Sequence, residues 1–149
     1  MKKFKIEVIS KRAEKIDGLV SYWGRITIGN FSERFVLSVD SWSLNDYKQQ
    51  WADGLELIKS NYVSCLVVLA QNLRTNPLIE MWTLYKERKT VFIQNQLFNR
   101  EIIRELNLSV DLSNFDTKMA YQLVAATPRE TLTEEGEKIS EWNVDISEI

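Results

Sequence analysis

The side chains that could carry chemistry in this sequence of 149 residues are almost all carboxylates. The sequence contains no histidine and one cysteine, Cys65, which excludes Ser-His-Asp and Cys-His triads, zinc sites built on histidine or several cysteines, and disulfides. Because Cys65 lies in the apolar run SCLVVLA, we expect a buried small hydrophobe rather than a nucleophile. The five glycines are isolated, so the sequence has no glycine-rich phosphate-binding loop. We therefore expect no nucleotide, cofactor or metal site.

Paired carboxylates are the remaining route to catalysis, because two of them can act as general acid and base on a glycosidic bond. Glu80 beside Trp82 and Glu141 beside Trp142 are candidates, although such residues more often face water on a strand. The sequence thus favours a binding protein over an enzyme. Two alternatives stay open. A small carboxylate-dependent enzyme would have a concave pocket with two converging acids, and a peptide-binding adaptor would have an unpaired strand edge.

Charge is unevenly distributed along the chain. The net charge is -2, which argues against the nucleic-acid backbone as the main ligand. Residues 2–15 hold six basic side chains against two acids, whereas residues 130–149 hold seven acids against Lys138 alone. Either the two ends lie together and partly neutralise each other, or the acidic end binds a cationic partner.

Hydrophobic periodicity predicts the elements that position these groups. Apolar and polar residues alternate in 4–8, 20–28 and 31–39, which predicts three strands with one buried face each. Gly29-Asn30 predicts a tight hairpin turn between the second and third strands. At Ser43 the spacing changes to three and four, which predicts an amphipathic helix to about Asn61 with Ser43 as N-cap and Asp46 near the capping-box position.

The second half of the chain predicts a sheet with one less regular region. The apolar run 63–70 is typical of a central strand covered on both faces, and 81–86 and 90–98 predict a second hairpin. Residues 99–107 have helical composition, 109–127 give no clear assignment, and 142–146 alternate like a last strand. The sequence therefore predicts a single α+β domain over 1–149: a mainly antiparallel sheet with one principal amphipathic helix packed on one face. No secretory signal or membrane span is visible, which favours the cytoplasm.

Acidic and aromatic residues are the candidate binding groups. One side of the predicted helix carries three carboxylates in a line, and the C-terminal segment carries six more. Trp23 is out of phase with the apolar face of its strand, and Trp42 precedes the helix cap, so we expect both to be exposed anchors. The predicted binding residues are Asp46, Asp53, Glu56, Glu130, Glu134, Glu135, Glu137, Glu141, Asp145, Trp23 and Trp42.

Three segments, covering somewhat under half of the chain, carry a specific combination of motifs. They read IGNFSERFVLSVDSWSLNDYKQQWADGLE (28–56), MWTLYKERKTVFIQNQLF (81–98) and PRETLTEEGEKISEW (128–142). Together they resemble a family of bacterial immunity proteins from contact-dependent growth inhibition systems. The resemblance implies a cytoplasmic antidote that binds the C-terminal toxin domain of a large secreted exoprotein, commonly a nuclease, without catalysing a reaction. Net charge and the lack of a long apolar run predict neither nucleic acid nor membrane as a partner. The resemblance also implies that the shared motif residues form the scaffold rather than the toxin contacts.

An acidic antidote for a nuclease is also physically reasonable. A nuclease surface is often basic because its substrate is a polyanion, and carboxylates on a rigid protein can imitate the spacing of phosphates. The sequence therefore predicts steric and electrostatic occlusion of the toxin as the mechanism.

Overall fold

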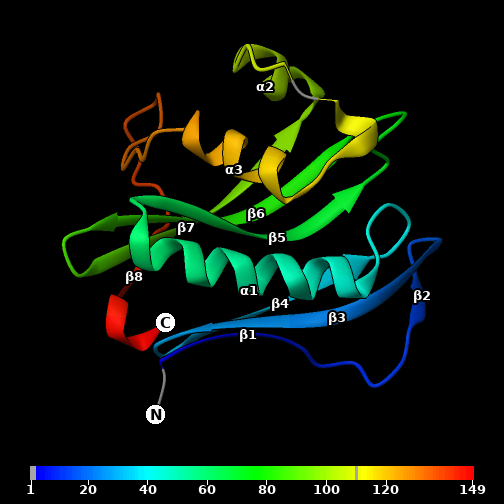
Figure 1. Cartoon of the computed structure of the whole chain (residues 1–149), viewed down its shortest axis with the longest axis horizontal. Helices are drawn as coiled ribbons and strands as arrows, with labels where there is room; N and C mark the ends of the chain where they lie inside the picture. The colour runs from blue at the N-terminus through cyan, green and yellow to red at the C-terminus, as the bar shows by residue number, and fades with distance from the viewer. Residues whose placement is uncertain (1–2, 110) are drawn as a thin grey trace.

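The computed structural model describes residues 3–109 and 111–149, so Lys2 of the basic segment lies outside the described residues. Figure 1 shows the arrangement of the strands and helices. In chain order the elements are β1 Phe4–Val8, β2 Glu14–Ile16, β3 Leu19–Ile28, β4 Phe31–Ser38, α1 Leu44–Ser60, β5 Val63–Gln71, β6 Leu78–Glu87, β7 Thr90–Asn99, α2 Arg100–Glu105, η1 Leu112–Asn114, α3 Thr117–Ala125, β8 Trp142–Asp145 and η2 Ile146–Glu148.

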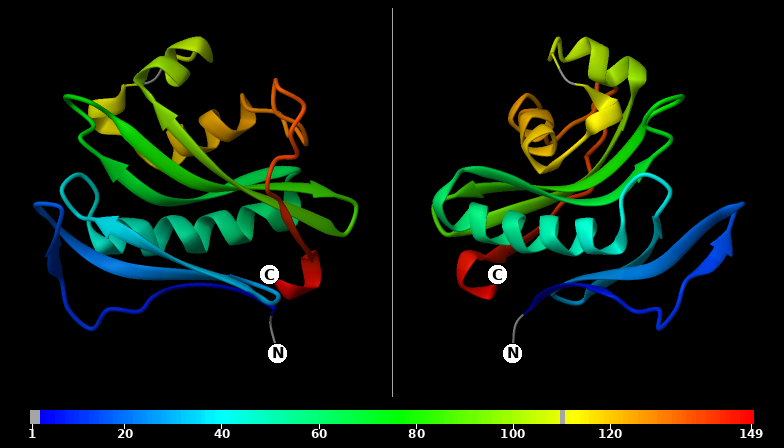
Figure 2. Two further views of the ribbon diagram at one scale, coloured as in Figure 1. Left: turned by 180° about the vertical axis from the view of Figure 1, so that it is seen from behind. Right: turned by 45° about the vertical axis from the view of Figure 1, so that its right-hand side comes forward.

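The strands form two antiparallel sheets, which confirms the α+β class. In the first sheet β3 pairs with β1 and β2, and with β4 along its other edge. The second sheet has the order β5-β6-β7-β8. The principal helix α1 lies along the gap between the two sheets, as the views in Figures 1 and 2 show. The strands are thus divided between two sheets that share one helix, where the sequence suggested one sheet.

Helix α1 begins and ends where the sequence predicts. The backbone N–H of Asp46 donates to Ser43 Oγ at 3.1 Å, and the N–H of Ser43 donates to Asp46 Oδ2 at 2.8 Å, which completes a capping box. The C-cap is Asn61, whose N–H donates to the carbonyl of Leu57. The helix buries one stripe, which includes Tyr47, Gln50, Trp51, Gly54 and Ile58. The capping residues lie next to the helix in the sequence, so the start and end of α1 could be predicted from the sequence alone.

Strand β5 is an edge strand, so its predicted central position is wrong. It lies at one end of the second sheet and pairs with β6 alone within the described chain. The prediction that both of its faces are covered is confirmed, because α1 and α3 lie on opposite sides of the sheet (Figure 1). Cys65 is fully buried in this strand, as predicted. An apolar run reports burial of the two faces and carries no information about hydrogen-bonding neighbours.

Side chains of α1 satisfy the outer backbone edge of β5. Gln50 Nε2 donates to the carbonyl of Cys65 at 2.8 Å, and its Oε1 accepts from the N–H of Val67 at 2.6 Å. Trp51 Nε1 donates to the carbonyl of Val67 at 2.7 Å. The hydroxyl of Tyr47 accepts from the N–H of Ala70 at 3.0 Å and donates to the carbonyl of Ser38 on β4 at 2.7 Å. The β5 edge is therefore closed, and one hydroxyl links the two sheets.

The remaining predicted strands and helices are confirmed. The β6–β7 hairpin turns at Arg88, whose φ of 58° is left-handed, and β8 pairs antiparallel with β7. Helix α2 occupies part of the region with helical composition. In the unassigned region 109–127, α3 is capped by Asp116, whose side chain accepts from the N–H of Met119 at 2.9 Å. Within residues 3–109 and 111–149, none of the helices has the length and apolar character of a membrane-spanning segment.

Three aromatic rings join the sheets near the β3–β4 turn. Phe31 stacks on Trp142 with ring centroids 4.3 Å apart, and Trp82 lies 5.6 Å from Trp142 and 6.4 Å from Phe31. Each ring comes from a different element, namely β4, β6 and β8. Aromatic packing of this kind fixes the distance between the sheets at this end of the molecule.

Candidate functional site

The acidic face of α1 is exposed but partly neutralised. Asp53 accepts a hydrogen bond from Gln49 at 3.2 Å, and Glu56 pairs with Lys59 at 3.2 Å. Asp46 is also exposed, but its carboxylate completes the capping box of the helix. A partner could therefore engage Asp53 and Glu56 without disturbing the fold, whereas Asp46 has a structural role as well.

The acidic loop, which we define as residues 130–138, is the larger anionic surface. Its carboxylates belong to Glu130, Glu134, Glu135 and Glu137, all exposed, and in the described part of the chain none of them forms an ion pair. The loop is held in a hairpin shape: Leu132 bridges to Lys138, and the N–H of Thr133 donates to the carbonyl of Glu137 at 2.7 Å. The carboxylates are thus carried on a constrained loop.

Among residues 3–109 and 111–149, no ion pair joins the two oppositely charged segments. The acidic loop lies beside α3, on the far side of the second sheet from β1 (Figures 1 and 2). On β1, Lys5 pairs with Glu7 of the same strand at 3.4 Å. Only the last residues of the chain approach the start of β1. This arrangement favours the alternative that we considered, in which the acidic end binds a cationic partner.

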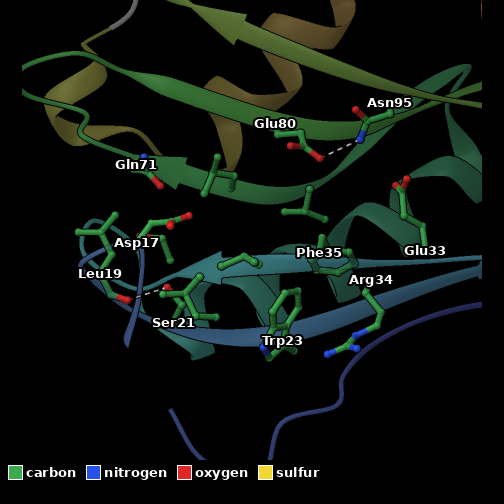
Figure 3. A pocket seen from close by; sticks show the side chains of 15 residues that line it. Asp17, Leu19, Ser21, Trp23, Glu33, Arg34, Phe35, Gln71, Glu80 and Asn95 are labelled. Atoms are coloured by element: carbon green, nitrogen blue, oxygen red, sulfur yellow. Dashed lines mark hydrogen bonds between the residues drawn. The ribbon is translucent and has the colours of Figure 1, made fainter. Parts of the chain in front are cut away.

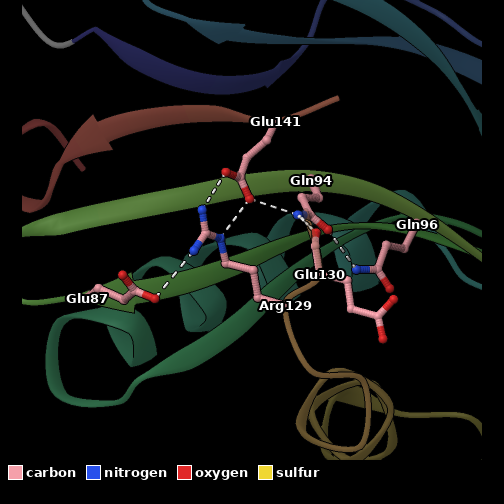
Figure 4. A network of polar contacts seen from close by, with 6 residues as sticks. All are labelled: Glu87, Gln94, Gln96, Arg129, Glu130 and Glu141. Atoms are coloured by element: carbon pink, nitrogen blue, oxygen red, sulfur yellow. Dashed lines mark hydrogen bonds and ion pairs between the residues drawn. The ribbon is translucent and has the colours of Figure 1, made fainter. Parts of the chain in front are cut away.

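Glu141 anchors the base of the acidic loop, as Figure 4 shows. Arg129 Nη2 and Nε donate to its two carboxylate oxygens at 2.6 and 2.7 Å, and Gln94 Nε2 donates to Oε2 at 2.7 Å. Gln94 also donates to the carbonyl of Glu130 at 2.8 Å, and the Arg129 guanidinium lies 3.7 Å from the Phe92 ring centroid. Glu141 therefore has a full set of partners within the chain, unlike the loop carboxylates. Asp145 is exposed and caps η2 through the N–H of Ser147 at 2.9 Å.

The Arg129–Glu141 pair predicts an acid-sensitive contribution to stability. The hydrogen bonds from Arg129 and then Gln94 lower the pKa of Glu141 below its ordinary value. A lowered pKa in the folded state stabilises the fold above the unfolded pKa, and this stabilisation is lost as pH falls through the folded pKa. We expect Glu141→Gln to lower the free energy of unfolding by about 1–2 kcal/mol at pH 7, and by much less at pH 3. Urea denaturation at both pH values measures this difference, with the exposed Glu137→Gln as control. An equal loss at both pH values would contradict the assignment.

Trp42 is buried, so its prediction as an exposed anchor is wrong. Its Nε1 donates to the carbonyl of Phe115 at 3.0 Å, and its ring lies 5.4 Å from that of Phe115 and 5.3 Å from that of Tyr47. The cause is a contact 73 residues away in sequence, because the segment before α3 folds over the start of α1. Periodicity near Ser43 carries no signal of such a contact.

Trp23 is half-buried, and it stays a candidate residue for binding the partner. Its Nε1 donates to Glu14 at 3.0 Å, and the guanidinium of Arg34 lies 4.5 Å from its ring centroid. This cation–π contact holds Arg34 against the sheet.

Trp23 also lines a groove between the two sheets, with a cavity volume of about 520 Å³. Glu33 on β4 and Glu80 on β6 approach this inter-sheet groove from opposite sheets, and Asn95 on β7 donates to Glu80 at 3.0 Å (Figure 3). Partial burial, and then repulsion from Glu80, raise the pKa of Glu33 above its ordinary value. Glu33 and Glu80 therefore give the groove negative charge, and within the described part of the chain neither of them forms an ion pair.

Sequence reasoning missed Glu33 and considered Glu80 only as an enzyme acid. Strand periodicity gives no indication that two sheets place these carboxylates at one groove. Two acids at a groove is the arrangement that we associated with a small enzyme, so the geometry alone fits either a catalyst or a binding surface. The comparison with known proteins favours binding.

The similarities of the chain to known proteins place it among the immunity proteins. It belongs to the CdiI N-terminal domain family, whose match extends over residues 37–149. The chain is 26% identical over 125 residues to the immunity protein CdiI of Enterobacter cloacae subsp. cloacae, covering 83% of this chain and 79% of that protein. It is also similar to a chain of the CdiA-CT/CdiI toxin and immunity complex from Enterobacter cloacae, with a TM-score of 0.78, 26% identity, and coverage of 97% of this chain and 91% of that chain.

Proposed function

We propose that this chain binds and neutralises the C-terminal toxin domain of the exoprotein from its own contact-dependent growth inhibition system, in the cytoplasm of the protected cell. The observation that supports this most directly is the shared fold over nearly the whole chain with a member of a toxin and immunity complex. The family membership and the anionic surfaces point in the same direction.

The mechanism that fits these surfaces is occlusion of a nuclease. The acidic loop and the exposed carboxylates of Asp53 and Glu56 present negative charge where a polyanion-binding surface would otherwise hold phosphates. This negative charge accelerates the encounter with a basic toxin surface. The rest of the contact surface then keeps the nucleic-acid substrate away from the toxin. The toxin is a protein partner, and the proposal needs neither a cofactor nor a covalent step.

Growth rescue tests the proposal. Cells that express the C-terminal toxin domain encoded beside this chain should resume growth when the chain is co-expressed, because binding removes the toxin activity. A toxin domain from an unrelated inhibition system serves as the control and should stay lethal. Continued growth arrest with the neighbouring toxin, while the chain is expressed in folded form, would overturn the proposal. Turnover of a glycoside or other small substrate by the purified chain would favour the enzyme alternative.

A further inference from the structure

The outer edge of β4 is open where it borders the inter-sheet groove. Ile28 and Phe31 flank a two-residue turn, and the N–H of Val39 donates to the carbonyl of Val20 at 3.0 Å. Hydrogen-bonded pairs alternate along an antiparallel ladder, so the odd-numbered residues of β4 bond to β3. The even-numbered residues direct their N–H and C=O groups away from β3. These are Ser32, Arg34, Val36 and Ser38.

Most of this edge lacks a partner, in contrast to the neighbouring edge of β5. Tyr47 occupies the carbonyl of Ser38, but in residues 3–109 and 111–149 the outward backbone groups of Ser32, Arg34 and Val36 have no hydrogen-bond partner. The β5 edge on the other side of the groove is closed by the side chains of α1. Only one of the two edges that face each other is therefore able to accept a further strand.

The groove also favours one kind of occupant. Glu33 and Glu80 approach it from the two sheets, and Asp17 lies at its far end. The single cationic group in its lining, Arg34, is stacked on Trp23 and points away from Glu33 and Glu80 (Figure 3). An extended segment with Lys or Arg side chains would satisfy the free backbone groups and compensate the carboxylates together.

We propose that an extended basic segment of the toxin domain lies in the inter-sheet groove and pairs with the outer edge of β4 as an added strand. This inference rests on the proposed function and specifies which surface of the chain the toxin uses. Side chains of a strand alternate between its two faces, so basic residues two apart would both reach the Glu33 and Glu80 side. The acidic loop and the face of α1 would then attract the toxin, while the β4 edge would hold it.

Hydrogen exchange of the wild-type chain tests the pairing directly. The amide hydrogens of Arg34 and Val36 point into the groove, so they should exchange at least about tenfold more slowly in the complex with the toxin domain than in the free chain. The amides of Phe35 and Leu37, which already bond to β3, report general stabilisation and serve as the internal reference. Unchanged exchange at Arg34 and Val36 in a formed complex would overturn the strand pairing and leave the proposed function standing. Failure of the wild-type chain to bind the toxin would overturn the proposed function and this inference with it.

A proline substitution provides the second test. Val36→Pro removes one outward N–H and places a ring in the groove, while the β3–β4 ladder keeps its hydrogen bonds. We expect the dissociation constant of the toxin complex to rise by about 30-fold or more. Val20→Thr, at an exposed position of β3 outside the groove lining, is the control and should stay within about twofold of wild type. Wild-type affinity in a folded Val36→Pro chain would overturn the pairing. If that variant does not fold, the exchange experiment on the wild type decides.

The charge of the occupant has its own test. The double substitution Glu33→Gln with Glu80→Gln should raise the dissociation constant by about tenfold, because both carboxylates face the bound segment. Glu101→Gln on α2, which removes a carboxylate outside the groove, is the matched control and should leave the affinity unchanged. Equal affinity of the double variant and wild type would overturn the basic character of the segment.

Discussion

Replacement of Gly54 by alanine should lower the free energy of unfolding by about 3 kcal/mol. A Cβ at this position would overlap the backbone carbonyl oxygen of Cys65. The obstacle is backbone, so α1 must move away from β5 to make room. This movement would weaken the hydrogen bonds from Gln50 and Trp51 that close the β5 edge.

Helix propensity favours alanine at this position. The sign of the net change in the free energy of unfolding therefore depends on how large this propensity effect is. Alanine is favoured over glycine inside a helix by about 1 kcal/mol, which offsets only part of the overpacking and the lost edge contacts. The melting temperature should fall by roughly 10 °C for a domain of this size. Gln49→Ala, at an exposed position of the same helix, is the control and should change little. An unchanged or raised melting temperature for Gly54→Ala would show that α1 can shift without cost.

Neutralising the acidic loop should slow association with the toxin by about 10- to 100-fold at low ionic strength. The variant carries Glu130→Gln, Glu134→Gln, Glu135→Gln and Glu137→Gln. The wild-type rate should fall steeply with added salt, because surface charge is screened over a Debye length of about 8 Å at physiological ionic strength. The variant should be slow at both low and high salt. Its stability should stay near that of wild type, since the four side chains are exposed.

Stopped-flow measurement of the association rate at two ionic strengths separates the two acidic surfaces. Asp53→Asn with Glu56→Gln on α1 is the comparison, and Asp46 is left unchanged because it caps the helix. A larger decrease of the association rate in the α1 variant than in the loop variant would identify α1, instead of the acidic loop, as the surface that steers association. Rates independent of salt in all three proteins would contradict electrostatic steering altogether.

The sequence predicted the elements that depend on local signals. Ser43 and Asp46 mark the start of α1 by a capping box, and Gly29 marks a hairpin by its ability to take a positive φ, here 60°. Cys65 was predicted as buried from its apolar neighbours, which is also local information. Such signals act within a few residues, so they can be interpreted without knowledge of the tertiary structure.

The sequence did not predict features that depend on distant contacts. Trp42 is buried by Phe115, and the β5 edge is closed by side chains from α1, so neither follows from periodicity. The candidate site shows the same division. Trp23 was identified by its phase along a strand, whereas Glu33 became a candidate only when the second sheet placed Glu80 at the same groove. The exposed loop acids were found by composition alone.

The aromatic contact among Phe31, Trp82 and Trp142 joins the two sheets two residues beyond Glu33 on β4 and Glu80 on β6. A toxin segment longer than the inter-sheet groove would therefore extend past the opposite end of the groove, beside Asp17. The aromatic contact would limit how far this segment can shift along β4. The same toxin residue would therefore lie next to the aromatic rings in every complex.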